Sequence, residues 1–205
     1  MLSDDFVSPE IIRSDVVFAG RVWNIRQDTF VLEADHITRE YMDHTGAVAV
    51  LALDERDRVL LIKQYRHPVR MRDWELPAGL LDIRGESPLV AAQRELAEEV
   101  DLVAGRWDLL CEFQSSPGGS NEALRVYLAR DVSAAPEVFE RTEEEAGIER
   151  LWVDLDEAVD AVLARRAQNS ILAIAVLTAR LERDRGFTGL GDPRAPWPRH
   201  PANRA

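Results

Sequence analysis

Short alternations of apolar and polar residues characterise the first part of the chain. Segments such as FVLEAD and ITREYM, within residues 13–44, alternate with the two-residue period of a half-buried β-strand, and Gly20 is a turn signal. This pattern predicts short antiparallel strands. We therefore expect a small N-terminal β-sheet within residues 1–45, ahead of the main domain.

Two strongly apolar segments follow this region. AVAVLAL at residues 47–53 and VLLIKQY at residues 59–65 are separated by the polar stretch DERDR, which predicts a β-hairpin with one well-buried strand. Three further segments have the composition of strands: LLCEFQS (109–115), ALRVYLA (123–129) and ERLWVDL (149–155). Together these segments predict a mixed β-sheet at the centre of the domain.

After Glu86 the pattern changes to the helical period. Apolar residues recur there at three- and four-residue spacing: Leu89, Ala92, Leu96 and Val100. Ser87 can cap this helix and Pro88 suits its first position. LDEAVDAVLARR (155–166) and SILAIAVLTARLERD (170–184) also have helical patterns. The order of elements predicts an α+β fold or an α/β/α sandwich.

Length and composition favour one compact domain. The 205 residues, 46% of them hydrophobic, can bury one substantial core but hardly two. We expect that core within residues 46–185. The tail, residues 186–205, is rich in glycine and proline and should add little core, with Trp197 as its one candidate for docking.

Charge and cysteine content narrow the partners and the compartment. A net charge of −12 disfavours binding to nucleic acid, and the longest apolar run, Ile171–Leu177, is far shorter than the roughly 20 residues that span a bilayer. The single cysteine, Cys111, fits a reducing compartment, and the acidic N-terminus does not have the order of a signal peptide. We therefore expect a cytoplasmic protein that binds a small molecule, not nucleic acid or a membrane.

Three carboxylates lie on one face of the helix that follows Ser87. Residues on a helix are set about 100° apart, so Glu95, Glu98 and Glu99 fall within roughly a third of its circumference. Like charges at this spacing cost a few tenths of a kcal/mol per pair, and a bound cation would remove that cost. Oxygen ligands without histidine or cysteine suit Mg²⁺ or Mn²⁺. The alternative from charge pattern alone is a solvated acidic surface.

The wider segment GLLDIRGESPLVAAQRELAEEVDL, residues 79–102, resembles the Nudix box. The residues in register with that motif are Gly79, Glu86, Arg94, Glu95, Leu96, Glu98 and Glu99. Two features depart from it. Six residues separate Gly79 from Glu86 where five are commonest, and Asp101 stands where the family has the glycine that ends the helix. Asp101 should adopt a left-handed conformation, which aspartate tolerates better than most residues.

The resemblance implies the Nudix fold and a metal-dependent pyrophosphatase. It places divalent Mg²⁺ or Mn²⁺ on Glu95, Glu98 and Glu99, with the Ala78 carbonyl as a further ligand, and it gives Arg94 the role of orienting the carboxylates. Within the family, Pro117, which lies 15 residues beyond Leu102, resembles the signature of the ADP-ribose pyrophosphatase subgroup. The implied reaction converts ADP-ribose and water to AMP and ribose 5-phosphate.

Substrate contacts follow from similarity to the same subgroup. The segments GRVWNIR, YRHPVRMRDWELPAG and QSSPGGSNE supply the expected substrate-binding residues, which are Trp23, Arg26, Arg66, Arg70, Glu75, Pro117 and Glu122. The resemblance gives Trp23 an adenine-stacking role and Arg66 a diphosphate contact. From the residue types alone, Trp23 can equally be a core tryptophan, and Arg66 can equally form a structural ion pair.

The resemblance also assigns a general base and an oligomeric state. It favours Glu145, in ERTEEEAGIERLW, as the catalytic base, with Glu144 as the fallback and an exposed acidic loop as the alternative. It implies a homodimer joined partly through residues 13–44. Two rival functions stay open: a Nudix enzyme for another nucleoside diphosphate sugar or a dinucleotide, and a sensor that binds ADP-ribose without hydrolysing it.

Overall fold

The computed structural model of the chain describes residues 2–139 and 147–203, which form two compact units. The smaller unit comprises Met1–His44 with Ser116–Glu122, and the larger comprises Thr45–Ser115 with Ala123–Ala205. Each unit is considered by itself. No helix in the described residues is long and apolar enough to cross a membrane.

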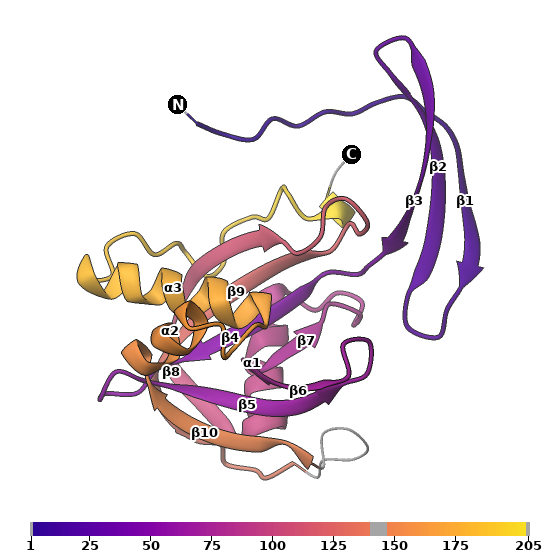
Figure 1. Ribbon diagram of the computed structural model, residues 1–205. Coiled ribbons are helices and arrows are strands. Elements are labelled where there is room, and N and C mark those ends of the chain that lie inside the picture. The colour runs from indigo at the N-terminus through magenta and orange to yellow at the C-terminus, as the bar shows by residue number, and fades with distance from the viewer. Residues whose placement is uncertain (1, 140–146, 204–205) are drawn as a thin grey trace. The chain divides into compact units, whose positions relative to one another are not determined.

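The smaller unit contains the expected antiparallel sheet (Figure 1). Its strands are β1 (Ile11–Ala19), β2 (Asn24–Leu32) and β3 (Asp35–Asp43), in the order β1-β2-β3. Every residue of β1 except Asp15 is exposed, including the apolar Ile12, Val16 and Phe18. This sheet therefore buries little apolar surface within the single chain.

The larger unit contains two further sheets. One has the order β7-β4-β9-β8, formed by β4 (Ala47–Ala52), β7 (Ala78–Leu80), β8 (Leu102–Gln114) and β9 (Ala123–Ala134), and β4 runs parallel to β9. The other has the order β10-β5-β6, formed by β5 (Arg58–Arg66), β6 (Met71–Glu75) and β10 (Glu149–Asp154). The helices of the larger unit are α1 (Pro88–Val100), α2 (Leu155–Leu163), α3 (Ser170–Asp184) and a short 3₁₀ turn at Pro201–Asn203.

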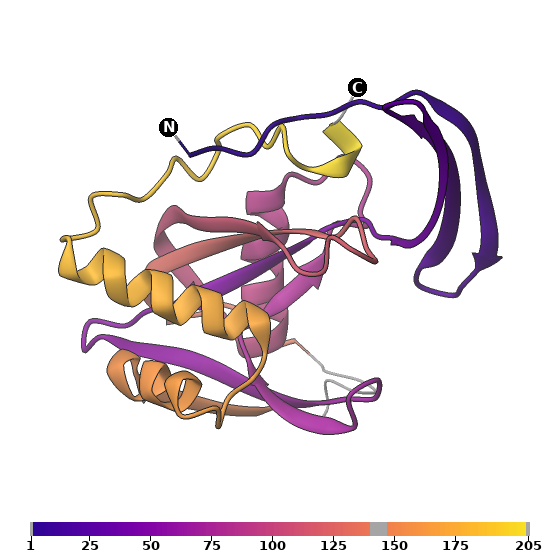
Figure 2. The ribbon, with the colours of Figure 1, turned by 45° about the horizontal axis from the view of Figure 1, so that its top comes forward.

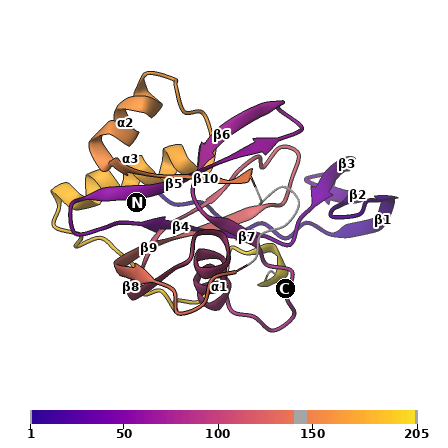
Figure 3. The ribbon, with the colours of Figure 1, turned by 90° about the horizontal axis from the view of Figure 1, so that it is seen from below.

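The central strands supply two apolar cores on opposite faces. In β4, Val48 and Val50 belong to the core that includes α1, whereas Ala49 and Leu51 belong to the core that includes α2 and α3. Successive strand residues point to opposite faces, so one strand can serve both. Figure 3 shows α1 on one side of these strands and α2 and α3 on the other. This arrangement confirms the α/β/α sandwich.

The predicted hairpin of residues 47–53 and 59–65 is wrong. β4 pairs with β7 and β9, whereas β5 pairs with β6 and β10, and only an isolated bridge joins Leu53 to Val59. The turn between them is held by Asp54, whose carboxylate accepts hydrogen bonds from the Arg56 and Arg58 backbone amides. All of β4 and the Val59–Ile62 part of β5 are apolar and buried, so each strand lies inside a different sheet instead of forming an edge pair.

The tail contributes more to the larger unit than its composition predicts. Figure 2 shows the segment after α3 running back over the strands, where Gly191 pairs with Leu109 of β8. Trp197 is buried, as expected for a docked residue, and the Arg125 guanidinium lies 4.7 Å from its ring centre. Arg125 also donates to the carbonyls of Ala195 and Pro196. A buried arginine thus holds a segment that has few apolar residues of its own.

Candidate active site

The acidic helix α1 has the ends that its sequence predicts. The Ser87 hydroxyl accepts a hydrogen bond from the Val90 amide at 3.4 Å, and Pro88 occupies the first turn. At the other end Asp101 is left-handed, with φ 56° and ψ 39°, and its amide donates to the carbonyl of Ala97. The helix therefore has fixed ends on both sides of its carboxylates.

Strand β7 brings the backbone of the preceding loop against this helix. Ala78 and Gly79 pair with Ala49 and Val48 of β4, which fixes the register of β7 against β4. The Glu99 carboxylate, only 5% exposed, accepts a hydrogen bond from the Ala78 amide at 3.0 Å. Two of the predicted metal ligands, Ala78 and Glu99, therefore lie side by side.

Gly79 is required by space. A Cβ built at this position would overlap the Glu95 side chain, which packs directly on the glycine backbone. Any larger residue would push that carboxylate away from β7. The motif needs glycine at this position because a side chain would collide with Glu95. The reason is space, not an unusual backbone angle.

Arg94 connects three of the carboxyl groups. Its guanidinium donates to both oxygens of Glu86 at 3.0 Å, to Glu95 at 2.7 Å and to Glu98 at 2.9 Å. The hydrogen bond with Glu86 is the main cause that raises the pKa of Arg94, and the same bond lowers the pKa of Glu86. One arginine thereby bonds Glu95 and Glu98 of the acidic face, and the resemblance implies that it orients them.

The donor set suits a hard divalent cation. Glu86, Glu95, Glu98 and Glu99 offer only oxygen atoms, and the Arg94 guanidinium bonds the first three of these carboxyl groups. In the described part of the chain, no three His, Cys, Asp or Glu side chains are already close enough together to hold a metal ion. The chemistry of these oxygen ligands fits Mg²⁺ or Mn²⁺. In this structure the carboxylates of Glu95 and Glu98 accept hydrogen bonds from Arg94.

The predicted diphosphate contact, Arg66, forms an ion pair with a buried carboxylate. Arg66, at the end of β5, donates two hydrogen bonds to the Glu75 carboxylate, at 2.9 and 2.7 Å. Glu75 is 3% exposed and also accepts from Gln64. The structure thus joins two predicted substrate residues to each other, which is the ion-pair alternative for Arg66. Arg70 lies in the exposed turn between β5 and β6, with φ 53°.

The remaining predicted substrate residues belong to the smaller unit. Trp23 is 40% exposed and stacks on His44, with ring centres 5.6 Å apart, so it is not a core tryptophan in the single chain. His44 is buried, its nearer ring nitrogen lies 3.4 Å from Glu122, and burial lowers its pKa. Arg26 pairs with Asp43 at 3.0 Å. Pro117 is in the exposed segment between β8 and β9.

Both candidates for the general base, Glu144 and Glu145, lie outside the described residues. The segment that contains them begins after Phe139 and ends before Gly147. Ile148, just beyond it, packs on the core shared with α1, and Arg72 donates to the Gly147 carbonyl at 3.3 Å.

Sequence patterns did not identify two residues that support these groups. Gln64 bonds Glu75, and Arg150 bonds the C-terminal end of α1. The Gln64 contact depends on β6, a strand that the pattern did not predict, and the Arg150 contact depends on β10, which pairs with the distant β5, so local spacing carries no signal for either.

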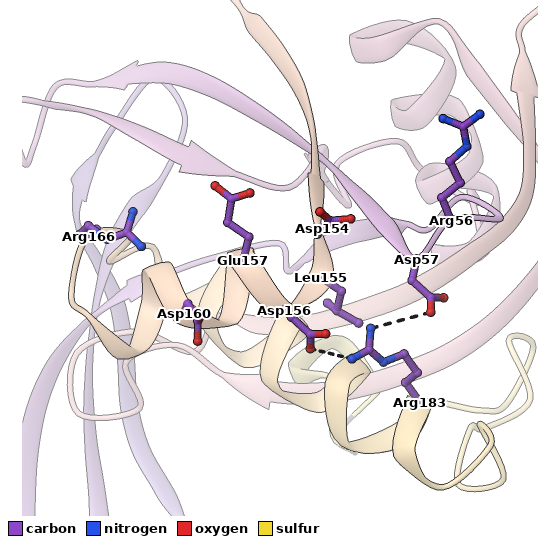
Figure 4. A pocket seen from close by; sticks show the side chains of 9 residues that line it. All are labelled: Arg56, Asp57, Asp154, Leu155, Asp156, Glu157, Asp160, Arg166 and Arg183. Atoms are coloured by element: carbon purple, nitrogen blue, oxygen red, sulfur yellow. Dashed lines mark hydrogen bonds and ion pairs between the residues drawn. The ribbon is translucent and has the colours of Figure 1, made fainter.

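A cavity of about 470 Å³ lies elsewhere, where α2 begins (Figure 4). Arg183, which lines it, pairs with Asp156 at 2.6 Å and with Asp57 at 3.8 Å. None of the predicted site residues lines this cavity. It is therefore separate from the acidic face of α1.

Comparison with known proteins gives consistent findings. A family model described as the NUDIX domain matches residues 43–173. An ADP-ribose pyrophosphatase of Mycobacterium tuberculosis is 39% identical over 198 residues, which is 95% of this chain and 90% of that protein. A methanol dehydrogenase activator of Bacillus methanolicus is 33% identical over 172 residues, covering 83% of this chain and 92% of its own.

A solved structure adds support for the fold. The crystal structure of an ADP compounds hydrolase superposes with a TM-score of 0.73 and covers 90% of this chain and 99% of its own. The two sequences are 21% identical, so this likeness concerns architecture alone.

Proposed function

Because the chain belongs to the Nudix family, we propose that it is a metal-dependent hydrolase of the pyrophosphate bond of ADP-ribose. The observation that carries this proposal is the complete carboxylate face of α1. Arg94 orients it, Gly79 makes room for it, and the Ala78 amide holds Glu99. The M. tuberculosis relative supports ADP-ribose as the substrate.

In the proposed reaction one group of residues binds the metal ions and Arg94 orients the carboxylates. Glu95, Glu98 and Glu99, with the Ala78 carbonyl, would hold the metal ions. When bound, Mg²⁺ or Mn²⁺ supplies charge neutralisation for the diphosphate and a water of lowered pKa. Arg94 keeps the carboxylates of Glu95 and Glu98 oriented when the cations are absent. Such orientation before binding reduces the reorganisation that catalysis requires.

The proposed substrate contacts are those expected from the sequence. Arg66 and Arg70 would meet the diphosphate, Trp23 would stack on adenine, and the remaining positions, Arg26, Glu75, Pro117 and Glu122, would complete the site. The ion pair with Glu75 would help Arg66 to bind the diphosphate. It fixes the plane of the guanidinium, while 44% of the arginine side chain stays accessible. A cytoplasmic location and the lack of nucleic-acid partners stay predictions.

The proposed reaction is tested by product analysis. With Mg²⁺ or Mn²⁺, the purified protein should convert ADP-ribose to AMP and ribose 5-phosphate in equal amounts, measured by chromatography. A parallel series with GDP-mannose, other ADP-sugars and dinucleotides serves as the comparison. A higher kcat/KM for one of those compounds would reassign the substrate within the family. Binding of ADP-ribose without AMP over a wide range of metal concentrations would indicate a sensor instead.

We also propose a homodimer built partly through residues 13–44. The apolar residues exposed on β1, which include Ile12, Val16 and Phe18, give a three-stranded sheet that cannot bury its surface alone. A second copy of the chain is the proposed cover, and its sheet would supply Trp23 to the adenine. Light scattering at micromolar concentration should give twice the 23.1 kDa chain mass. A monomeric mass would contradict this proposal.

A further inference from the structure

The aspartate that ends α1 makes contacts that the glycine of the family motif cannot make. Asp101 has φ 56°, a left-handed conformation that costs a residue with a Cβ more than it costs glycine. Its side chain is largely buried, at 18% exposed, and both of its oxygens accept hydrogen bonds. The strained position therefore carries a side chain with specific partners.

Those partners lie before and after one segment of the chain. Asp101 Oδ2 pairs with Arg150 Nη1 at 2.8 Å, and the same nitrogen donates to the Val100 carbonyl at 3.0 Å. Asp101 Oδ1 accepts from the Phe139 amide at 3.4 Å, and the Asp101 main-chain carbonyl accepts from the Ala135 amide at 2.8 Å. Residues 135–139 precede the segment 140–146, and Arg150 follows it.

We propose that Asp101 is a positioning residue that holds both ends of this segment against the catalytic helix. It lies two residues after Glu99, so the distance from the carboxylate face of α1 to Phe139 and to Arg150 is fixed through one side chain. The proposal rests on the proposed hydrolase function, because it concerns geometry at that site. It does not depend on which residue is the general base.

The decisive variant is Asp101→Gly, which relieves the left-handed strain while removing both side-chain contacts. We expect an unchanged or higher melting temperature, together with a kcat lower by about tenfold and a nearly unchanged KM. Asp131→Gly is the matched control, because Asp131 on β9 is also left-handed, with φ 55°, and is exposed. That control should keep the wild-type kcat.

A readout without substrate separates positioning from catalysis. Hydrogen exchange of the metal-free protein should speed up at the Phe139 amide in Asp101→Gly. The Ala135 amide should keep its protection, because it bonds to the main-chain carbonyl that glycine retains. Arg150→Gln should reproduce the loss of kcat, and combining it with Asp101→Gly should add little, as expected for two residues that act through one contact.

The outcomes that overturn the proposal are distinct from failure of the proposed function. Wild-type kcat and unchanged Phe139 exchange in Asp101→Gly would overturn it, as would a kcat that falls only in step with the melting temperature. If the wild-type protein does not hydrolyse ADP-ribose, the function proposal fails, while the exchange measurement still decides whether Asp101 holds the segment.

Discussion

Replacing Glu99 with glutamine should lower kcat by about 10³-fold or more while the protein stays folded. Glu99 is buried beside β7, where its carboxylate accepts the Ala78 amide. Glutamine has nearly the same volume and can still accept that hydrogen bond, but it removes a negative charge from the proposed metal site. Loss of a single electrostatic contribution to a transition state typically costs about 10²–10³ in kcat, and a weakened metal site adds to that loss.

The free energy of unfolding distinguishes this effect from damage to the fold. Without metal, Glu99→Gln should be as stable as the wild type or more stable, because one like-charge interaction on the helix face is lost. With metal, the variant should gain less stability than the wild type does, since a ligand that binds only the folded state stabilises it in proportion to its affinity. Thermal melts with and without Mg²⁺ measure both quantities.

Glu182 provides a matched control for this experiment. It is also a buried glutamate on a helix, 7% exposed, and its carboxylate accepts the Gly189 amide at 2.8 Å. Because it lies on α3, outside the acidic face of α1, Glu182→Gln should leave kcat and the metal-induced stabilisation unchanged. Near wild-type activity in a folded Glu99→Gln protein would instead show that Glu99 is a buried structural carboxylate and that the reaction does not need its charge.

The helix that carries the site was predictable because its signals are local. Ser87, Pro88 and the apolar spacing fix where α1 begins and ends, and the observed bounds, Pro88–Val100, are the predicted ones. The left-handed conformation of Asp101 was also expected, in this case from the resemblance, because Asp101 stands where the Nudix box has the glycine that ends the helix. These features depend on residues within a turn or two of one another.

Pairings between distant strands were not predictable in the same way. The stretches 47–53 and 59–65 were expected to form a hairpin, because both are apolar and a short polar turn separates them. The first strand pairs with β7 and β9 instead, and the second pairs with β6, which follows it directly, and with the distant β10. Periodicity identifies the faces of a strand, but a wholly apolar strand has two buried faces, so its pattern does not identify its neighbours.

The candidate site shows the same division. The acidic face and its arginine follow from helical spacing, and the resemblance to the Nudix box gave their roles. By contrast, the Arg66–Glu75 pair depends on β6, a strand that the sequence pattern did not predict. The packing of the C-terminal tail was underestimated for a similar reason. The buried Arg125 on β9 binds two carbonyls of the tail, and the composition of the tail does not indicate this contact.

The general base is the site residue with the least local signal, and its test has the second largest expected effect. Its candidates lie between Phe139 and Gly147, outside the described residues, but the described residues on both sides belong to the larger unit. Asp101 bonds the Phe139 amide, and Ile148 packs on the core that α1 shares. The described residues on both sides, Phe139 and Ile148, therefore contact either the residue that ends α1 or the core that α1 shares.

Glu145→Gln should lower kcat by about 10²–10⁴, the usual contribution of a positioned general base. The amide keeps the size and hydrogen bonding of the side chain but cannot accept a proton, so KM should change little. Metal-induced stabilisation should persist, because the proposed metal ligands are on α1 and β7. Glu144→Gln is the control, with wild-type kcat expected. If the two results are exchanged, the base is Glu144, and if both variants keep full kcat, the base lies outside this segment.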